Sequence, residues 1–164
     1  MKLKMQFIVR KGNKADLPAV LELIKELAVY EKAPLEVTLT LQELERDGFG
    51  EKPVYSLFVA ESRGEIIGMA LYYLKYSTWK GTCIFLEDII VKEQYRGHKV
   101  GLKLFEAIVR VSKEMNVPRM EWQVLDWNEP AINFYKKFNS YLDDGWINCK
   151  LVHAQIQAFE FSED

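Results

Sequence analysis

The stretch that decides the fold runs Leu86-Glu87-Asp88-Ile89-Ile90-Val91 and, three residues later, Tyr95-Arg96-Gly97-His98-Lys99-Val100-Gly101. Its apolar, β-branched first part predicts a strand, and the residues after it predict a helix from about Val100 to Met115. A turn that opens directly into a helix points backbone N–H groups at one spot, where the helix dipole adds positive potential. Such a turn suits a pyrophosphate, although spacing alone favours an ordinary basic turn, because short glycine motifs give many false positives.

Upstream of this strand, the sequence predicts two helices and further strands. Asn13 and Thr40 are each suited to cap a helix, the first running to about Tyr30 and the second stopping near Gly48. After Val54 the period changes to that of strands. The predicted strands are Phe7–Arg10, Tyr55–Ala60, Ile66–Tyr76 and Thr82–Val91, and the last three are expected to form an antiparallel meander.

Downstream, Met120–Leu125 is predicted as another strand, and Asn128 is expected to cap a short helix with Pro130 in its first turn. Trp146–Phe161 is predicted as one or two closing strands. No repeat or linker interrupts the chain, so residues 1–164 are expected to form a single domain. Helices that flank a mixed sheet place this domain in the α/β class, in its mixed α+β form.

Composition disfavours several classes of protein. Hydrophobic residues make up 49% of the chain, yet no stretch approaches the roughly 18 apolar residues of a membrane span. A net charge of -2 without a long basic run argues against nucleic acid as a partner. Cys83 and Cys149, without a secretory signal, predict free thiols in a cytoplasmic protein. His98 and His153 have no Cys or His neighbour at ligand spacing, so no metal site is expected.

The turn at residues 96–101 resembles the acyl-CoA-binding signature of the GNAT N-acetyltransferases, Arg/Gln-x-x-Gly-x-Gly/Ala. Arg96 and Gly101 match its first and last positions, and Lys99 replaces its middle glycine. The resemblance implies acetyl-CoA as cosubstrate and a GNAT fold, with a mostly antiparallel central sheet, a splayed strand pair and flanking helices. The cosubstrate-binding residues that it implies are Ile89, Ile90, Val91, Arg96, Gly97, His98, Lys99, Val100, Gly101, Asn128 and Ala131.

Longer motifs are similar to the diamine acetyltransferases, also called spermidine/spermine N1-acetyltransferases. They are Asp47-Gly48-Phe49-Gly50, Tyr76-Ser77-Thr78-Trp79-Lys80-Gly81, Leu86-Glu87-Asp88, Asp126-Trp127-Asn128-Glu129-Pro130 and Ala131-Ile132-Asn133-Phe134-Tyr135-Lys136. The 77–81 loop and Val124-Leu125-Asp126-Trp127 look more like the second isoform type, which prefers thialysine-like amines. The resemblance covers residues 8–146 and implies a homodimer whose active sites lie near the subunit interface.

Acetylation of an amine needs a proton acceptor, because an alkyl ammonium with a pKa of about 10 must lose its proton before it attacks a thioester. Glu87 lies in an otherwise apolar strand, at the position of the family's glutamate, and is the candidate. The alternative is that Glu87 simply faces solvent. Adjacent strand residues point to opposite faces, so Glu87 and Asp88 reach one site only if a bulge intervenes.

Tyr135 is the candidate acid for the departing CoA thiolate, at the position of the family's catalytic tyrosine. Phe134 and Tyr135 alone would be interpreted as ordinary core aromatics, and the surrounding motif favours the catalytic role. A phenol has a higher pKa than a thiol, so a hydrogen bond to the sulfur is as plausible as complete proton transfer.

By the same resemblance, an acidic amine site is expected. Its predicted residues are Tyr30, Glu31, Glu87, Asp88, Ser77, Thr78, Trp79 and Asp144. Each carboxylate has an alternative interpretation as a solvated surface charge, and Trp79 can either wall the amine pocket or anchor its loop.

These motifs together predict an acetyl-CoA-dependent N-acetyltransferase acting on a small aliphatic amine, such as a diamine, a thialysine-like amine or a polyamine. The alternatives are a protein N-terminal or lysine acetyltransferase, and a sensor that binds acetyl-CoA without catalysis. The fold alone does not choose between them.

Overall fold

The computed structural model describes residues 5–162. The chain divides into two compact units, Met1–Gln123 and Val124–Asp164, which are described in turn. The predicted single domain remains a prediction, and its two ends, residues 1–4 and 163–164, lie outside the described residues. No helix within residues 5–162 combines the length and the apolar character needed to span a membrane.

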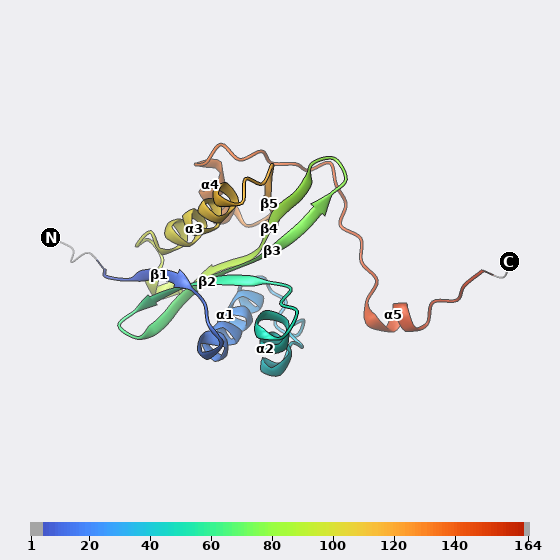
Figure 1. Cartoon of the computed structure of the whole chain (residues 1–164), viewed down its shortest axis with the longest axis horizontal. Coiled ribbons are helices and arrows are strands. Elements are labelled where there is room, and N and C mark those ends of the chain that lie inside the picture. The colour runs from blue at the N-terminus through green and yellow to red at the C-terminus, as the bar shows by residue number, and fades with distance from the viewer. Residues whose placement is uncertain (1–4, 163–164) are drawn as a thin grey trace. The chain divides into compact units, whose positions relative to one another are not determined.

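The first unit is a five-stranded sheet with helices on both faces (Figure 1). The strands, which lie side by side in chain order, are β1 (Ile8–Lys11), β2 (Ser56–Ser62), β3 (Glu65–Ser77), β4 (Gly81–Val91) and β5 (Met120–Trp122). The meander of β2, β3 and β4 is antiparallel, as the sequence predicted, and only β5 runs parallel to its neighbour. The predicted α/β class with a mixed, mostly antiparallel sheet is therefore confirmed.

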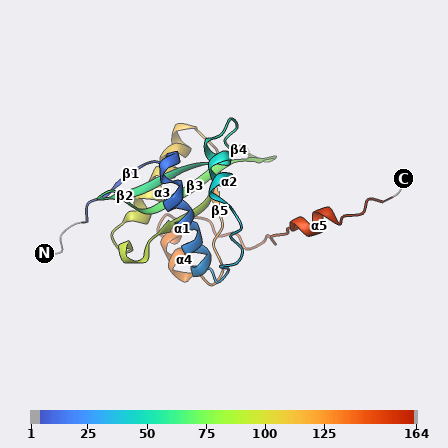
Figure 2. The same ribbon diagram turned by 90° about the horizontal axis from the view of Figure 1, so that it is seen from below.

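Helices α1 (Leu17–Tyr30) and α2 (Leu41–Phe49) cover one face of the sheet, and α1 lies across it in Figure 2. Both predicted caps are present, and each forms a capping box, at Asn13 before a short 3-10 helix (Lys14–Asp16) and at Thr40 before α2. The side chains buried between these helices and the sheet are Leu17, Val20, Leu23, Leu44, Leu57, Val59, Ile66, Met69 and Ile90. This apolar burial is the main stabilising contribution on that face.

Helix α3 (Val100–Glu114) covers the opposite face and follows a second 3-10 helix, Glu93–Tyr95. It buries Leu104, Phe105 and Ile108 against the strands. Gly68 on β3 permits the close packing, since a Cβ there would lie 2.7 Å from the Ile90 carbonyl oxygen and 3.3 Å from Leu104 Cδ1.

Two irregularities break the regular pairing of β4. Leu71 pairs with Asp88 and Tyr72 with Leu86, so Glu87 is an extra residue that has no partner on β3. On its other side, β4 pairs with β5 only from Ile84 to Leu86. The strand end from Glu87 to Val91 therefore has no neighbour in β5, which is the splayed strand pair expected from the sequence.

The second unit contains α4 (Glu129–Lys136) and the five-residue helix α5 (His153–Gln157). The prediction of closing strands at Trp146–Phe161 is wrong, because no strand occurs in the described part of this unit. The β-branched and aromatic residues there are solvent-exposed, and β-propensity has an effect only where a neighbouring strand offers a surface to pack on. The strand predicted at Met120–Leu125 ends early, at Trp122.

Candidate active site

The bulge in β4 gives Glu87 and Asp88 a common environment. Asp88 is half-buried, and Glu87 is exposed. Burial, which is the largest cause, and the negative charges of Glu87 and Glu31 together raise the pKa of Asp88 from 3.8 to about 6. Glu87 and Glu31, from two parts of the chain, therefore both act on Asp88, and an unbulged strand with opposite-facing neighbours does not readily bring Glu87 and Asp88 to one site.

Glu31 lies at the end of α1, where burial raises its pKa. The neighbouring Tyr30 ring lies under the Arg96 guanidinium, 5.2 Å from ring centroid to Cζ. Arg96 also donates from Nε to the Val91 carbonyl oxygen at 3.1 Å. The structure thus brings the end of α1, the end of β4 and the turn before α3 together on one side of the first unit.

The turn before α3 has the geometry of an anion-binding helix start. Gly97 and Lys99 adopt positive φ angles of 79° and 66°, and α3 begins at Val100. The first N–H groups of a helix have no partner within that helix, so those of this turn are available to a phosphate. Lys99 occupies a left-handed conformation that favours glycine, the residue that the GNAT signature has at this position.

Three residues that sequence reasoning missed hold this turn in place. Tyr95 Oη donates to Glu65 Oε2 at 2.6 Å, and Lys92 Nζ donates to Glu65 Oε1 at 2.9 Å. These bonds tie the turn to the start of β3. No local sequence pattern predicts these hydrogen bonds, because Glu65 lies 27 residues before Lys92.

The loop residues Ser77, Thr78 and Trp79 lie apart from the carboxylates. Ser77 pairs with Gly81 at the tip of the β3–β4 hairpin, and Gly81 lies six residues before Glu87 along β4. At 3.3 Å per residue, the tip is about 20 Å from Glu87. Within one chain, the structure does not bring these predicted amine-site residues to the acidic cluster.

The remaining predicted residues belong to the second unit. Asn128 is buried, and its Oδ1 accepts from the Ala131 backbone N–H at 3.3 Å, which caps α4 as the sequence predicted. Tyr135 is 5% exposed, and its ring lies 5.3 Å from that of Phe134. Asp144 is exposed in the irregular segment after α4.

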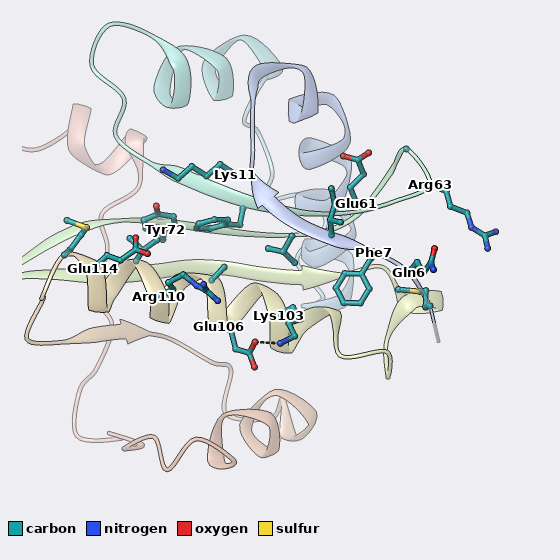
Figure 3. Close-up of a pocket in the computed structure, with 18 residues that line it drawn as sticks. Gln6, Phe7, Lys11, Glu61, Arg63, Tyr72, Lys103, Glu106, Arg110 and Glu114 are labelled. Carbon is teal, nitrogen blue, oxygen red and sulfur yellow. Dashed lines mark hydrogen bonds and ion pairs between the residues drawn. The ribbon is translucent and has the colours of Figure 1, made fainter. Parts of the chain in front are cut away.

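A groove of about 1590 Å³ lies between strands β1 to β3 and helix α3 (Figure 3). Phe58 and Tyr72 line it, together with charged residues of α3 such as Lys103 and Glu106, which form an ion pair at 2.6 Å. None of the predicted site residues lines this groove. Among the described residues, no group of three or more His, Cys, Asp or Glu side chains is arranged to hold a metal ion.

Comparison with known proteins assigns the family. The profile described as "Acetyltransferase (GNAT) family" matches residues 17–140. The chain belongs to the GNAT acetyltransferase family. It is therefore an acetyltransferase, with acetyl-CoA as the cosubstrate of the family.

Two relatives of this GNAT acetyltransferase are named for small amines. The thialysine N-epsilon-acetyltransferase of Bos taurus is 41% identical over 141 residues, 80% of this chain and 83% of that protein. The human spermidine/spermine N(1)-acetyltransferase-like protein 1 is 31% identical over 150 residues, 85% of this chain and 22% of that protein.

Solved structures support the fold. An aminoglycoside N-acetyltransferase in complex with CoA has a TM-score of 0.72 and 18% identity, covering 92% of this chain and 98% of its own.

Proposed function

We propose that this GNAT acetyltransferase transfers the acetyl group of acetyl-CoA to the primary amine of a small aliphatic cation, with thialysine-like amines preferred. The observation that carries the proposal is the carboxylate cluster of Glu31, Glu87 and Asp88, in which the pKa of Asp88 is raised to about 6. The charges of Glu87 and Glu31 oppose ionisation of the buried Asp88, and a bound cation relieves that repulsion; the ammonium group of an amine substrate is such a cation.

Glu87 is the proposed proton acceptor. It takes a proton from the bound ammonium, directly or through a water, and the freed nitrogen attacks the thioester carbonyl. The tetrahedral intermediate collapses with loss of the CoA thiolate, and Tyr135 is the proposed donor of a hydrogen bond or proton to that sulfur. The products are the N-acetylated amine and CoA.

Acetyl-CoA is proposed to bind along the turn and the splayed strand end. The N–H groups of residues 97–101 face the pyrophosphate, and Arg96, His98 and Lys99 add positive charge. The pantetheine arm lies beside residues 89–91, where β4 has no β5 neighbour. Asn128 and Ala131 are proposed to complete the cosubstrate site.

A homodimer is proposed, in which the hairpin tip of one copy serves the site of the other. The tip exposes large side chains, with Leu74 55%, Tyr76 74% and Trp79 79% accessible. Ser77, Thr78 and Trp79 are about 20 Å from the acidic cluster of their own chain, so they contribute to an amine site only across subunits. The cytoplasmic location stays a prediction from the two free cysteines.

The test is a panel of amines assayed for CoA release at one pH and one ionic strength. Thialysine, lysine, a short diamine, spermidine, spermine and a peptide with a free N-terminus are compared by kcat/KM. Ser77 and Thr78 offer neutral hydrogen bonds and no extra carboxylate, so thialysine or a short diamine should exceed spermine. A kcat/KM for spermine tenfold above that for thialysine would replace this proposal with a polyamine acetyltransferase. Acetylation of the peptide would favour a protein substrate. Binding of acetyl-CoA without turnover of any amine would indicate a sensor.

A further inference from the structure

Tyr73 lies beside the bulge that presents Glu87. It pairs with Phe85, which lies two residues before Glu87 on β4, and the register shift that leaves Glu87 unpaired comes one pair later, between Tyr72 and Leu71 on β3. Tyr73 and Leu71 are two residues apart on one strand, so both face the core under α1, where Leu71 packs. The half-buried Tyr73 is therefore on the α1 side of the sheet.

The Tyr73 ring is held in place by its neighbours. Its centroid lies 5.3 Å from that of Phe85, at an interplanar angle of 31°. Lys75 Nζ lies 5.3 Å from the centroid of the same Phe85 ring and pairs with Glu121 of β5 at 3.4 Å. A packed ring leaves its hydroxyl little choice of direction.

The hydroxyl interacts with Glu87. Burial raises the pKa of Tyr73, and the charge of Glu87 together with a side-chain hydrogen bond to that carboxylate raises it further. A phenol whose pKa is raised is a neutral donor at working pH, so Tyr73 is placed to donate to the Glu87 carboxylate.

An exposed glutamate on a bulge needs such a restraint. Glu87 has no cross-strand partner, and a free glutamate side chain retains about 1.5–2 kcal/mol of rotamer entropy. A proton acceptor must stay within hydrogen-bond reach of the amine, and small displacements from that geometry slow the chemistry strongly.

We propose that Tyr73 is a positioning residue that fixes the Glu87 carboxylate for proton removal from the bound amine. The inference rests on the proposed function of Glu87. It adds a residue from β3 that acts through Glu87 and does not itself touch the reacting atoms.

The test compares Tyr73→Phe with Tyr72→Phe, measured on an amine that the native enzyme acetylates. Tyr73→Phe keeps the ring beside Phe85 and removes only the donor. Tyr72 points to the other side of the sheet, into the groove beside α3 (Figure 3), so its variant controls for loss of a buried hydroxyl. We expect kcat to fall about tenfold in Tyr73→Phe alone, with the acetyl-CoA KM unchanged.

The pH profile separates positioning from a purely structural role. Loss of a donor disfavours the charged carboxylate, so the acid limb of log kcat/KM should move to higher pH in Tyr73→Phe but not in Tyr72→Phe. That limb belongs to the whole cluster of Glu87, Asp88 and Glu31. The other charged groups on this side are Arg96, which lies over the Tyr30 ring, and the ion pair of Lys75 with Glu121.

A double variant decides whether Tyr73 acts through Glu87. In the Glu87→Gln background, Tyr73→Phe should cause no further loss of kcat. Additive losses in the double variant would overturn this inference and leave the proposed function intact. The same holds if Tyr73→Phe matches Tyr72→Phe in rate and pH profile while Glu87→Gln is slow. A Glu87→Gln enzyme as fast as the native one would overturn both.

Discussion

At the scale of single residues, Asp88 shows a conflict between stability and function. Its pKa is raised from 3.8 to about 6 by burial and by two neighbouring carboxylates. An isolated strand pattern gives no sign of this shift, because it depends first on burial in the folded chain and also on Glu31, which is 57 positions away in the sequence. Groups with strongly shifted pKa values in a concave, charged setting are candidates for binding or catalysis.

Asp88→Asn should therefore stabilise the protein at neutral pH. The folded pKa of Asp88 lies above its unfolded value, so its contribution to stability is fully present below about pH 4 and is lost as the pH rises through about 6. The free energy of unfolding of the variant should exceed that of the native protein by about 3 kcal/mol at pH 7 and by less than about 1 kcal/mol at pH 4. Urea unfolding at both pH values measures this difference, and equal differences at the two would contradict it.

Tyr135→Phe tests the proposed acid. Removal of the hydroxyl deletes an interaction with sulfur that strengthens only as negative charge develops there, so kcat should fall about tenfold or more while the acetyl-CoA Kd is unchanged. Stopped-flow acetylation and calorimetric titration measure the two quantities. Tyr141→Phe, at a side chain 88% exposed, is the control, and a native rate in Tyr135→Phe under chemistry-limited conditions would remove the residue from the mechanism.

At the scale of elements, periodicity and capping predicted most of the fold. The meander, both capping boxes and the start of α3 agree with the sequence, because each depends on residues close together in the chain. The prediction of closing strands at Trp146–Phe161 was wrong, since a strand requires a partner strand that composition does not reveal. The bulge at Glu87 was anticipated only as a condition for two adjacent carboxylates to share a site. The hydrogen bonds that Glu65 accepts from Lys92 and Tyr95 had no local sequence pattern that could predict them.

Gly101 in α3 provides a test of the phosphate-binding turn. A Cβ at this position would lie 3.7 Å from Val91 Cγ2, an ordinary contact, so the backbone there accepts a residue with a Cβ. Gly101→Leu should fold, and replacing a helical glycine generally stabilises by about 0.5–1 kcal/mol. It should nevertheless weaken acetyl-CoA binding by about 100-fold, because the side chain keeps the pyrophosphate away from the N–H groups.

The control for Gly101→Leu is Ala107→Leu, which adds similar bulk to α3 on the side of the groove. Circular dichroism checks folding, and calorimetric titration gives the acetyl-CoA affinity. A Gly101→Leu protein that is folded and binds acetyl-CoA as tightly as the Ala107→Leu protein would place the pyrophosphate elsewhere.

At the scale of the whole molecule, the residues proposed for the amine site lie far apart within one chain. The carboxylates are gathered at the end of α1 and the bulge of β4, whereas the loop that resembles the thialysine-preferring relatives is at the far end of the hairpin. Many oligomers are symmetric, and a two-fold dimer lets each hairpin reach the other copy's site while the same contact is made twice. Substrate choice would then be a property of the dimer and not of one chain.

Mixing two inactive variants distinguishes a shared site from a self-contained one. One variant carries Glu87→Gln, and the other carries Ser77→Ala, Thr78→Ala and Trp79→Ala together. If each hairpin serves the partner's site, a mixed dimer has one site with native Glu87 and a native loop, and one site with neither. If each hairpin serves its own chain, both sites of the mixed dimer are defective. Random reassociation of equal amounts makes half of the dimers mixed, so we expect recovery of about a quarter of native activity. Each variant alone, taken through the same dissociation and reassociation, is the control, and a mixture no more active than these controls would exclude the shared site.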